Sequence, residues 1–315
     1  MTNLDTYSMM QTTLGGEIHL SGVGVHSGRH VCVSLCPAAA DTGILFQRID
    51  IEGEDGFVLA HANNAIETQL CTRIENSAGI AVNMIEHLMA AFHGLGVDNA
   101  LVKIDGPEVP ILDGSSAIII ETITRAGILQ LDAPRHYIEI LEPVSVALET
   151  GATATLTPAG CLQLDVDIDF IDPGIGKQQC EFDITEQNFA DEIGLARTFC
   201  MLSDVEKMRN AGLAKGGSLD NALVYDNGQI MNEGGLRMTD ECVKHKALDC
   251  IGDLYLLGMP IKGRLTSHMP GHRLSTILVR AVLEQPSCYR IVSAQDDLAV
   301  APAVDLAAMP VAATA

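Results

Sequence analysis

The chain has 315 residues, of which 47% are hydrophobic, and its 19 basic and 41 acidic side chains give a formal net charge of -22. This length predicts about two packed domains, and the hydrophobic content excludes an intrinsically disordered protein. The acidic balance argues against nonspecific binding to nucleic acid, and the lack of an apolar run of roughly 18 residues argues against stable membrane insertion. Nine cysteines with no CxxC pair, and an N-terminus without a signal-peptide pattern, indicate reduced thiols in the cytoplasm.

The first half of the chain predicts several strands followed by two helices. Strands are expected at 17–20, 30–35 and 100–104. A helix is expected over 84–95, with Asn83 as its N-cap, because apolar residues recur on one face. A second helix is expected over 113–127, where an Asp-Gly-Ser-Ser segment begins it.

After a linker expected at residues 131–135, the second half repeats this pattern. Strands are expected near 137–149, 152–158, 161–169 and 222–225, and helices at 203–211, 239–257 and 271–284. Several strands and then helices in each half predict an α+β fold. We expect domains at 1–131 and 136–298 and a flexible tail at 299–315.

His245 and Asp249 are candidates for metal binding. They are four residues apart in the helix expected at 239–257, so both side chains project from one helical face. That spacing suits two ligands of one metal ion. Histidine and aspartate at this spacing usually form a surface pair or a hydrogen bond, and the spacing alone leaves these interpretations open.

Glu86 and His87 stand at the start of the first-half helix, where they could supply a carboxylate base and a third metal ligand. The alternative is an exposed first turn in which the helix dipole favours the glutamate. The HExxH motif of zinc proteases is absent, which excludes that class.

His272 follows a Pro-Gly pair, which predicts its place at a helix start. A helix N-terminus disfavours a charged imidazole, so a histidine acting there as an acid needs a carboxylate partner, and Asp253 is the candidate. The alternative is a solvent-facing histidine. Patterns of other classes are missing: residues 22–28 fail the GxGxxG fingerprint, and neither a phosphate-binding P-loop nor a GxSxG serine motif occurs.

Seven motifs run in order along almost the whole chain: GVGVHSG (22–28), IEHLMAAFHGLGVDN (85–99), PEVPILDGSSA (107–117), ARTF (196–199), GLAKGGSLDNALV (212–224), NEGGLRMTDECVKHKALDCIGDL (232–254) and PGHRLSTILVRAVL (270–283). Together they resemble the UDP-3-O-acyl-N-acetylglucosamine deacetylase family. The resemblance implies a zinc amidase that hydrolyses the N-acetyl group of a UDP-linked acylated amino sugar to the amine and acetate, the committed step of lipid A biosynthesis. It also implies two similar domains, each a small sheet packed on two helices, with the helices sandwiched between the sheets, and an insertion in each domain, near 40–75 and 199–227. We expect a monomer.

For the active site, the resemblance implies zinc with three protein ligands and one open position for water, which is the catalytic arrangement; Fe²⁺ could occupy the same ligands. The implied metal ligands are His87, His245 and Asp249. The implied catalytic residues are Glu86 as general base, His272 as the cation that stabilises the oxyanion or protonates the amine, Asp253 as the group that orients His272, and Thr198 as a hydroxyl donor to the oxyanion.

Substrate contacts also follow from the resemblance. They are Phe199 and Lys246 at the sugar and diphosphate, Asp169 and Phe170 at the uracil, and Gly217 within the segment 202–218 that is expected to line a passage for the acyl chain.

Three positions depart from the family pattern. Met84 stands where a Thr is frequent, and Met269 and Leu141 stand at or near two frequent Lys positions. Arg273 or Lys215 could supply the missing positive charge at the diphosphate.

Two other hypotheses remain open from the sequence. The first is a catalytically inactive binding or regulatory protein on the same fold, against which the joint presence of Glu86, His87, His245, Asp249 and His272 argues. The second is a zinc amidase that acts on another acylated sugar.

Overall fold

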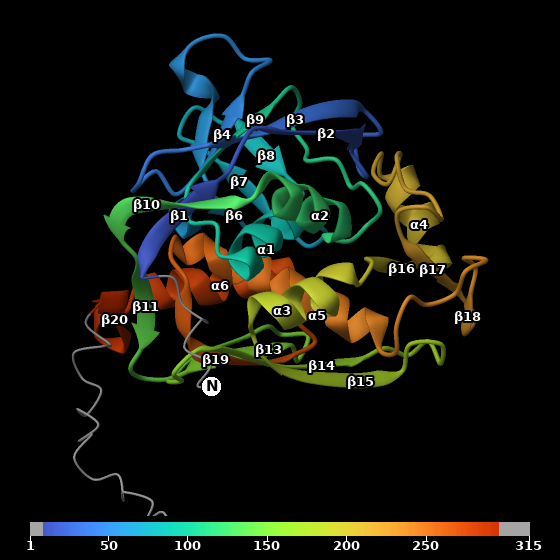
Figure 1. Cartoon of the computed structure of the whole chain (residues 1–315). Helices are drawn as coiled ribbons and strands as arrows, with labels where there is room; N and C mark the ends of the chain where they lie inside the picture. The colour runs from blue at the N-terminus through green and yellow to red at the C-terminus, as the bar shows by residue number, and fades with distance from the viewer. Residues whose placement is uncertain (1–8, 296–315) are drawn as a thin grey trace, which may run out of the picture.

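The computed structural model describes residues 9–295, so the tail expected at 299–315 lies outside the described residues. Two large sheets form the outer layers, and the main helices lie between them (Figure 1). The predicted α+β sandwich is therefore confirmed. Within residues 9–295, no helix combines the length and apolar character needed to cross a membrane.

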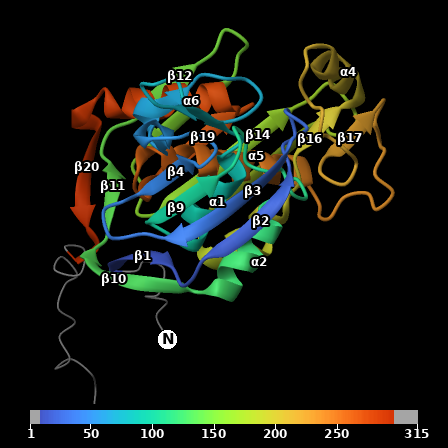
Figure 2. The ribbon, with the colours of Figure 1, turned by 90° about the horizontal axis from the view of Figure 1, so that it is seen from above.

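The first sheet has five strands in the order β2-β3-β9-β4-β5. Their bounds are β2 Ile18–Val23, β3 His30–Pro37, β4 Ile44–Arg48, β5 Phe57–Leu59 and β9 Ala100–Ile104. Only the β4–β9 pairing is parallel. Alternate residues of β3, including Val31, Val33 and Leu35, are buried, as the period of the sequence predicts. Figure 2 shows the strands lying over helix α1.

Helices α1 (Glu86–Leu95) and α2 (Ala117–Ala126) lie on the inner face of this sheet. The expectation that Asn83 caps α1 is wrong, because Asn83 ends strand β8 and donates both its backbone N–H and its side-chain amide to the carbonyl of Pro107. Met84 then takes a left-handed conformation with φ 59°, and the helix begins at Glu86.

The second sheet is built around β19, which pairs with β11, β13 and β14. Its strands are β11 His136–Ile140, β12 Val144–Ala147, β13 Thr153–Thr157, β14 Leu162–Asp169, β15 Lys177–Asp183, β19 Ile261–His268 and β20 Tyr289–Ser293. Its inner face carries α3 (Glu186–Asp191), α5 (Glu241–Leu254) and α6 (His272–Leu283). A 3₁₀ turn, Tyr255–Leu257, continues α5.

The predicted linker is mostly a strand. Strand β10 (Ile128–Pro134) pairs antiparallel with β1 (Met10–Leu14), so a two-stranded ribbon connects the halves of the chain. The domain bounds 1–131 and 136–298 remain our proposal.

Two small three-stranded sheets are separate from the two large ones. The first contains β6 Ala65–Ile66, β7 Arg73–Glu75 and β8 Ala81–Asn83. The first expected insertion, 40–75, is therefore too broad, since β4 and β5 belong to the main sheet. The second small sheet contains β16 Phe199–Met201, β17 Leu223–Asp226 and β18 Gln229–Ile230, with α4 (Leu202–Asn210) beside it. This unit projects from one side of the sandwich (Figure 1) and begins where the second insertion was expected.

Helices α1 and α5 cross in direct contact in the middle layer. A Cβ atom on Gly252 of α5 would lie 2.1 Å from the backbone oxygen of Glu86 and 3.0 Å from the backbone nitrogen of Ala90. Because neither backbone atom can move without shifting α1, this crossing requires glycine.

We therefore expect Gly252→Ala to destabilise the protein even though alanine favours helix by about 1 kcal/mol. Overpacking of this kind costs about 1–3 kcal/mol, and thermal or urea denaturation measures the net loss. Gly160→Ala is the matched control, because a Cβ there meets nothing within 4 Å. Equal stability of the Gly252 variant and the wild type would contradict the close crossing.

Candidate active site

Three potential metal ligands meet where α1 crosses α5. His87 is the second residue of α1, and His245 and Asp249 lie one turn apart on α5. Their ligand atoms all lie within 4.8 Å of one another. The Nε2 atoms of His245 and His87 lie 3.3 and 3.7 Å from Oδ1 of Asp249. All three residues are at most 6% exposed, so the alternatives of a surface pair and an exposed first turn are wrong.

The protonation of these groups suits a cation. Nδ1 of His245 lies 2.9 Å from the carbonyl oxygen of Ala196, which can only accept, so Nδ1 carries the proton and the Nε2 lone pair faces Asp249. Burial lowers the pKa of His245, and burial with the nearby His245 lowers that of His87 to about 3. Both imidazoles are therefore neutral, as metal ligands must be.

Asp249 carries the clearest indication of a metal site. Its Oδ1 is buried and finds no hydrogen-bond donor among the described residues, while its Oδ2 accepts from Nζ of Lys246 at 2.9 Å. Burial alone would raise the pKa of this carboxyl, but the positive charges of Lys246 and His272 outweigh it and hold the pKa below its usual value. An ionised oxygen that faces the Nε2 atoms of two neutral imidazoles fits a cation held by His87, His245 and Asp249.

Glu86 and His272 form a second pair beside the three ligands. Oε1 of Glu86 lies 3.6 Å from Nε2 of His272, and both side chains are buried. Burial raises the pKa of Glu86 to about 7, against the opposing charge of His272. Burial lowers the pKa of His272, but the carboxylates of Asp253 and Glu86 outweigh it and raise this pKa to about 9.

The carboxylate partner that the sequence requires for His272 is present. Oδ2 of Asp253 lies 3.1 Å from Nδ1 of His272. A side chain of α5 therefore holds the imidazole of the first residue of α6. His272 is 6% exposed, and the alternative of a solvent-facing histidine is wrong.

Two residues at this site were not expected from the sequence. Thr72, just before β7, donates its backbone N–H to Oε2 of Glu86 at 3.0 Å, and its hydroxyl contacts both Asp253 and His272. Nothing in the local sequence marks it. Glu241 lies four residues before His245, and this spacing on α5 could have indicated it.

Glu241 positions the segment that carries Thr198 and Phe199. It is fully buried and accepts hydrogen bonds from the backbone N–H and the side chain of Arg197. The backbone N–H of Thr198 in turn donates to the carbonyl of Gly114 at 2.7 Å. The Phe199 ring lies edge-on to His245 with centroids 6.4 Å apart.

The residues expected at the substrate are only partly brought together. The Phe170 and Phe199 rings are 5.3 Å apart, and Nζ of Lys246 lies 5.8 Å from the centre of the Phe199 ring. Asp169 is exposed and pairs with Lys177 at 3.2 Å. Gly217 lies in a separate turn, where a Cβ atom added to it would come closest to Ala214 and Val25.

The two cations considered as replacements for the missing lysines differ in their surroundings. Nε of Arg273 is bound to Glu67 at 3.2 Å. Lys215 is exposed, and its backbone N–H donates to the carbonyl of His26, which holds the turn against residues 22–28. Because Arg273 is paired with Glu67 and Lys215 lies in the turn beside residues 22–28, we assign neither to the diphosphate.

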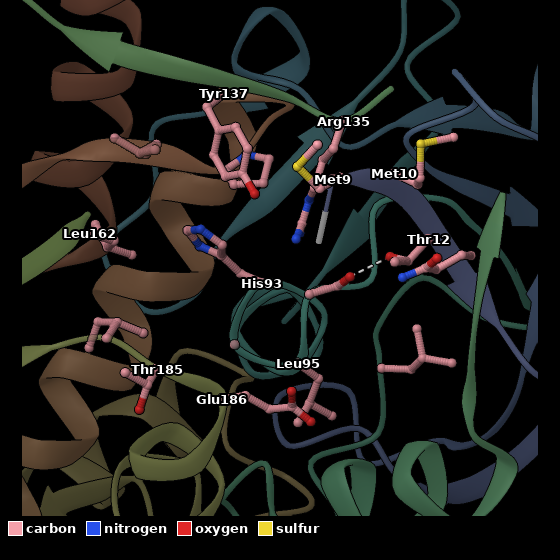
Figure 3. A pocket seen from close by; sticks show the side chains of 17 residues that line it. Met9, Met10, Thr12, His93, Leu95, Arg135, Tyr137, Leu162, Thr185 and Glu186 are labelled. Carbon is pink, nitrogen blue, oxygen red and sulfur yellow. Dashed lines mark hydrogen bonds between the residues drawn. The ribbon is translucent and has the colours of Figure 1, made fainter. Parts of the chain in front are cut away.

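The cavities do not all belong to this site. A cavity of about 670 Å³ lies at the other end of α1, around His93, Arg135 and Tyr137 (Figure 3), and is lined by none of the expected site residues. Another, of about 630 Å³, is lined by Cys71 and Arg73, the neighbours of Thr72, and by Leu213 from the expected passage segment. The chemistry of the side chains, and not cavity size, identifies the site.

A buried His-His-Asp cluster beside a carboxyl with a raised pKa and a cationic histidine defines a metal-dependent hydrolase. The sequence pattern of a family described as UDP-3-O-acyl N-acetylglycosamine deacetylase matches residues 11–284. A UDP-3-O-acyl-N-acetylglucosamine deacetylase from Phenylobacterium zucineum is 45% identical over 293 residues, which cover 93% of this chain and 100% of the relative. Enzymes of the same name from Brucella ovis and Brucella canis are 45% identical over 286 residues, or 90% of this chain and 99% of each relative. The chain belongs to the UDP-3-O-acyl-N-acetylglucosamine deacetylase family, a family of metalloenzymes, and the resemblance found in the sequence is confirmed.

Proposed function

We propose that the protein hydrolyses the N-acetyl group of UDP-3-O-(3-hydroxyacyl)-N-acetylglucosamine to the free amine and acetate, the committed step of lipid A biosynthesis. The observation that carries the proposal is the convergence of three metal ligands with Glu86 and the His272–Asp253 pair in a member of this family. The full set of groups for amide hydrolysis argues against an inactive binding protein.

His87, His245 and Asp249 would hold the metal, for which we propose zinc, with Fe²⁺ as the alternative. When bound, the ion supplies a Lewis acid that polarises the acetyl carbonyl and lowers the pKa of water to about 7. The nitrogen and oxygen donor set suits either metal, so metal analysis of the purified protein decides between them.

The remaining chemistry belongs to the proton-transfer groups. The Glu86 carboxylate accepts a proton from the attacking water, whose oxygen forms a bond to the acetyl carbon. His272, held protonated by Asp253, faces the same space through Nε2 and stabilises the oxyanion or donates its proton to the amine as the C–N bond breaks. The Thr198 hydroxyl is proposed as a further donor to the oxyanion.

The substrate would extend from the metal ligands in two directions. Phe199 and Lys246 flank His245 and Asp249, which supports contacts with the sugar and diphosphate, and Phe170 and Asp169 lie further out for the uracil. For the acyl chain, we propose the cavity of about 630 Å³ beside Thr72, with Gly217 in the neighbouring turn.

The pH dependence of kcat/KM should be bell-shaped. Below the pKa of Glu86, about 7, the base is protonated and the rate falls; above the pKa of His272, about 9, the acid is neutral and the rate falls again. A bound divalent cation repels protons, so both limbs of the loaded enzyme are expected at or below these values. Steady-state kinetics across this range measure both limbs. His272→Gln should remove the alkaline limb, and an unchanged alkaline limb in that variant would contradict the assignment.

Acetate release tests the function directly. Metal-loaded protein is incubated with the 3-O-acylated UDP-sugar and, as the matched control, with UDP-N-acetylglucosamine that lacks the acyl chain. We expect acetate and the free amine from the first substrate at a much higher kcat/KM. Equal turnover of both, or turnover only of a different acylated sugar, would favour another zinc amidase.

Three finer assignments complete the proposal. We propose a monomer, located in the cytoplasm, that binds its UDP-sugar without a nucleic-acid partner. Light scattering after size-exclusion chromatography measures the monomer mass, and cell fractionation measures the location.

A further inference from the structure

We infer that Thr72 is a positioning residue that holds both proton-transfer groups of the reaction, Glu86 through its backbone and the His272–Asp253 pair through its hydroxyl. The inference rests on the proposed function. Thr72 is 2% exposed and comes from the segment just before β7, whereas Asp253 and His272 lie 181 and 200 residues further along the chain. It therefore connects the first half of the chain to the catalytic groups of the second.

The backbone of Thr72 fixes the base. Its N–H donates to Oε2 of Glu86 at 3.0 Å, and its carbonyl accepts from the N–H of Ile85, the residue before Glu86, at 3.4 Å. A donor on Oε2 favours the ionised carboxyl and leaves Oε1 facing His272. The carboxylate is thus held in one orientation, with its reactive oxygen directed toward the acid.

The side chain of Thr72 fixes the acid. A carboxylate only accepts, so the hydroxyl donates its single proton to Oδ1 of Asp253. Its oxygen lies 3.0 Å from Nδ1 of His272, and Nδ1 also lies 3.1 Å from Oδ2 of Asp253. Oδ1 of Asp253 lies 3.3 Å from the same Nδ1. The Nδ1–H of His272 is therefore shared between acceptors on both residues, and the three side chains close a ring that prevents rotation of the imidazole.

A role in packing alone makes a different prediction. Thr72→Val keeps the branched shape and removes the hydroxyl, whereas Thr72→Ser keeps the hydroxyl and removes the methyl group. If the residue only fills space, valine should be the better substitute. If the hydroxyl positions His272 through Asp253, serine should be better.

Kinetics of these variants test the inference. Loss of the buried donor should lower kcat of Thr72→Val about 10- to 100-fold with KM within about twofold, while Thr72→Ser stays within about threefold of wild type. Thr13→Val is the matched control, because it removes an equally buried hydroxyl, bonded to the carbonyl of Asn99, away from the site; its kcat should not change. If Thr72→Val fails to fold by circular dichroism, Thr72→Ala replaces it in the comparison with serine.

A double-variant cycle separates action through Asp253 from a general disturbance. In an Asp253→Ala background the hydroxyl has lost its acceptor, so Thr72→Val should cause little further loss of kcat. Losses that multiply in the double variant, or a valine variant as active as the serine variant, would overturn the inference.

A measurement without substrate keeps this inference distinct from the proposed function. The Nδ1 proton of His272, identified by its disappearance in His272→Gln, should give a downfield NMR signal that shifts in Thr72→Val and returns in Thr72→Ser. An unshifted signal in the valine variant counts against the ring of hydrogen bonds. Absence of acetate release by the wild type, with the signal behaving as expected, counts against the proposed function and leaves the positioning role in place.

Discussion

Replacing His245 with alanine is expected to remove most of the bound metal and nearly all hydrolysis of the acetyl group. Wild-type protein should bind one divalent ion per chain, because its three ligand atoms meet in a single cluster. Alanine leaves only His87 and Asp249, so the loss of affinity should exceed the roughly 10- to 100-fold that follows when only an outer partner of a ligand is removed.

Elemental analysis after dialysis measures the metal content of this variant. Thermal unfolding gives an independent readout, because a ligand that binds only the folded state raises Tm; added zinc should raise Tm of the wild type and not of His245→Ala. His19→Ala is the matched control, since His19 is a surface residue with 73% of its side chain exposed. Full occupancy and normal turnover in His245→Ala would show that the metal is held elsewhere.

Local periodicity was sufficient for most of the fold. The strands expected at 30–35 and 100–104 became β3 and β9, and the two long second-half helices became α5 and α6. The errors occur where tertiary contacts decide the structure. Asn83 is of a residue type that favours the N-cap position, but its side-chain amide donates to the carbonyl of Pro107. The expected linker forms strand β10 because it pairs with β1 near the other end of the first half. Gln11 and Pro134, which are in contact there, lie 123 residues apart in the sequence.

The site residues also differ in whether local sequence spacing or tertiary packing determines them. Helical spacing placed His245 and Asp249 on one face of α5. The same spacing reaches Asp253 one step further along and Glu241 one step back. The spacing could not decide between a surface pair and a buried metal site, because burial depends on α1 crossing at Gly252. No local sequence pattern could predict the role of Thr72, because the packing of the two halves brings Asp253 and His272 to it.

The other large effect is expected from Glu86→Gln. Glutamine keeps the shape of the side chain and an oxygen for the N–H of Thr72, but it cannot accept a proton from water. Loss of a positioned base should lower kcat by about two to four orders of magnitude. The metal content should stay at wild-type level, because Glu86 is not among the three clustered ligands.

The structure also predicts that this variant folds. Burial raises the pKa of Glu86 to about 7, so the ionised carboxylate is costly in this site and a neutral amide is tolerated. Metal analysis, circular dichroism and kcat are measured together on Glu86→Gln and on a control, Glu121→Gln. Glu121 is an exposed glutamate of α2 that pairs with Arg125. A folded, metal-loaded Glu86→Gln protein with near wild-type kcat would mean that another group accepts the proton, and His272, 3.6 Å away, would be the first residue to test.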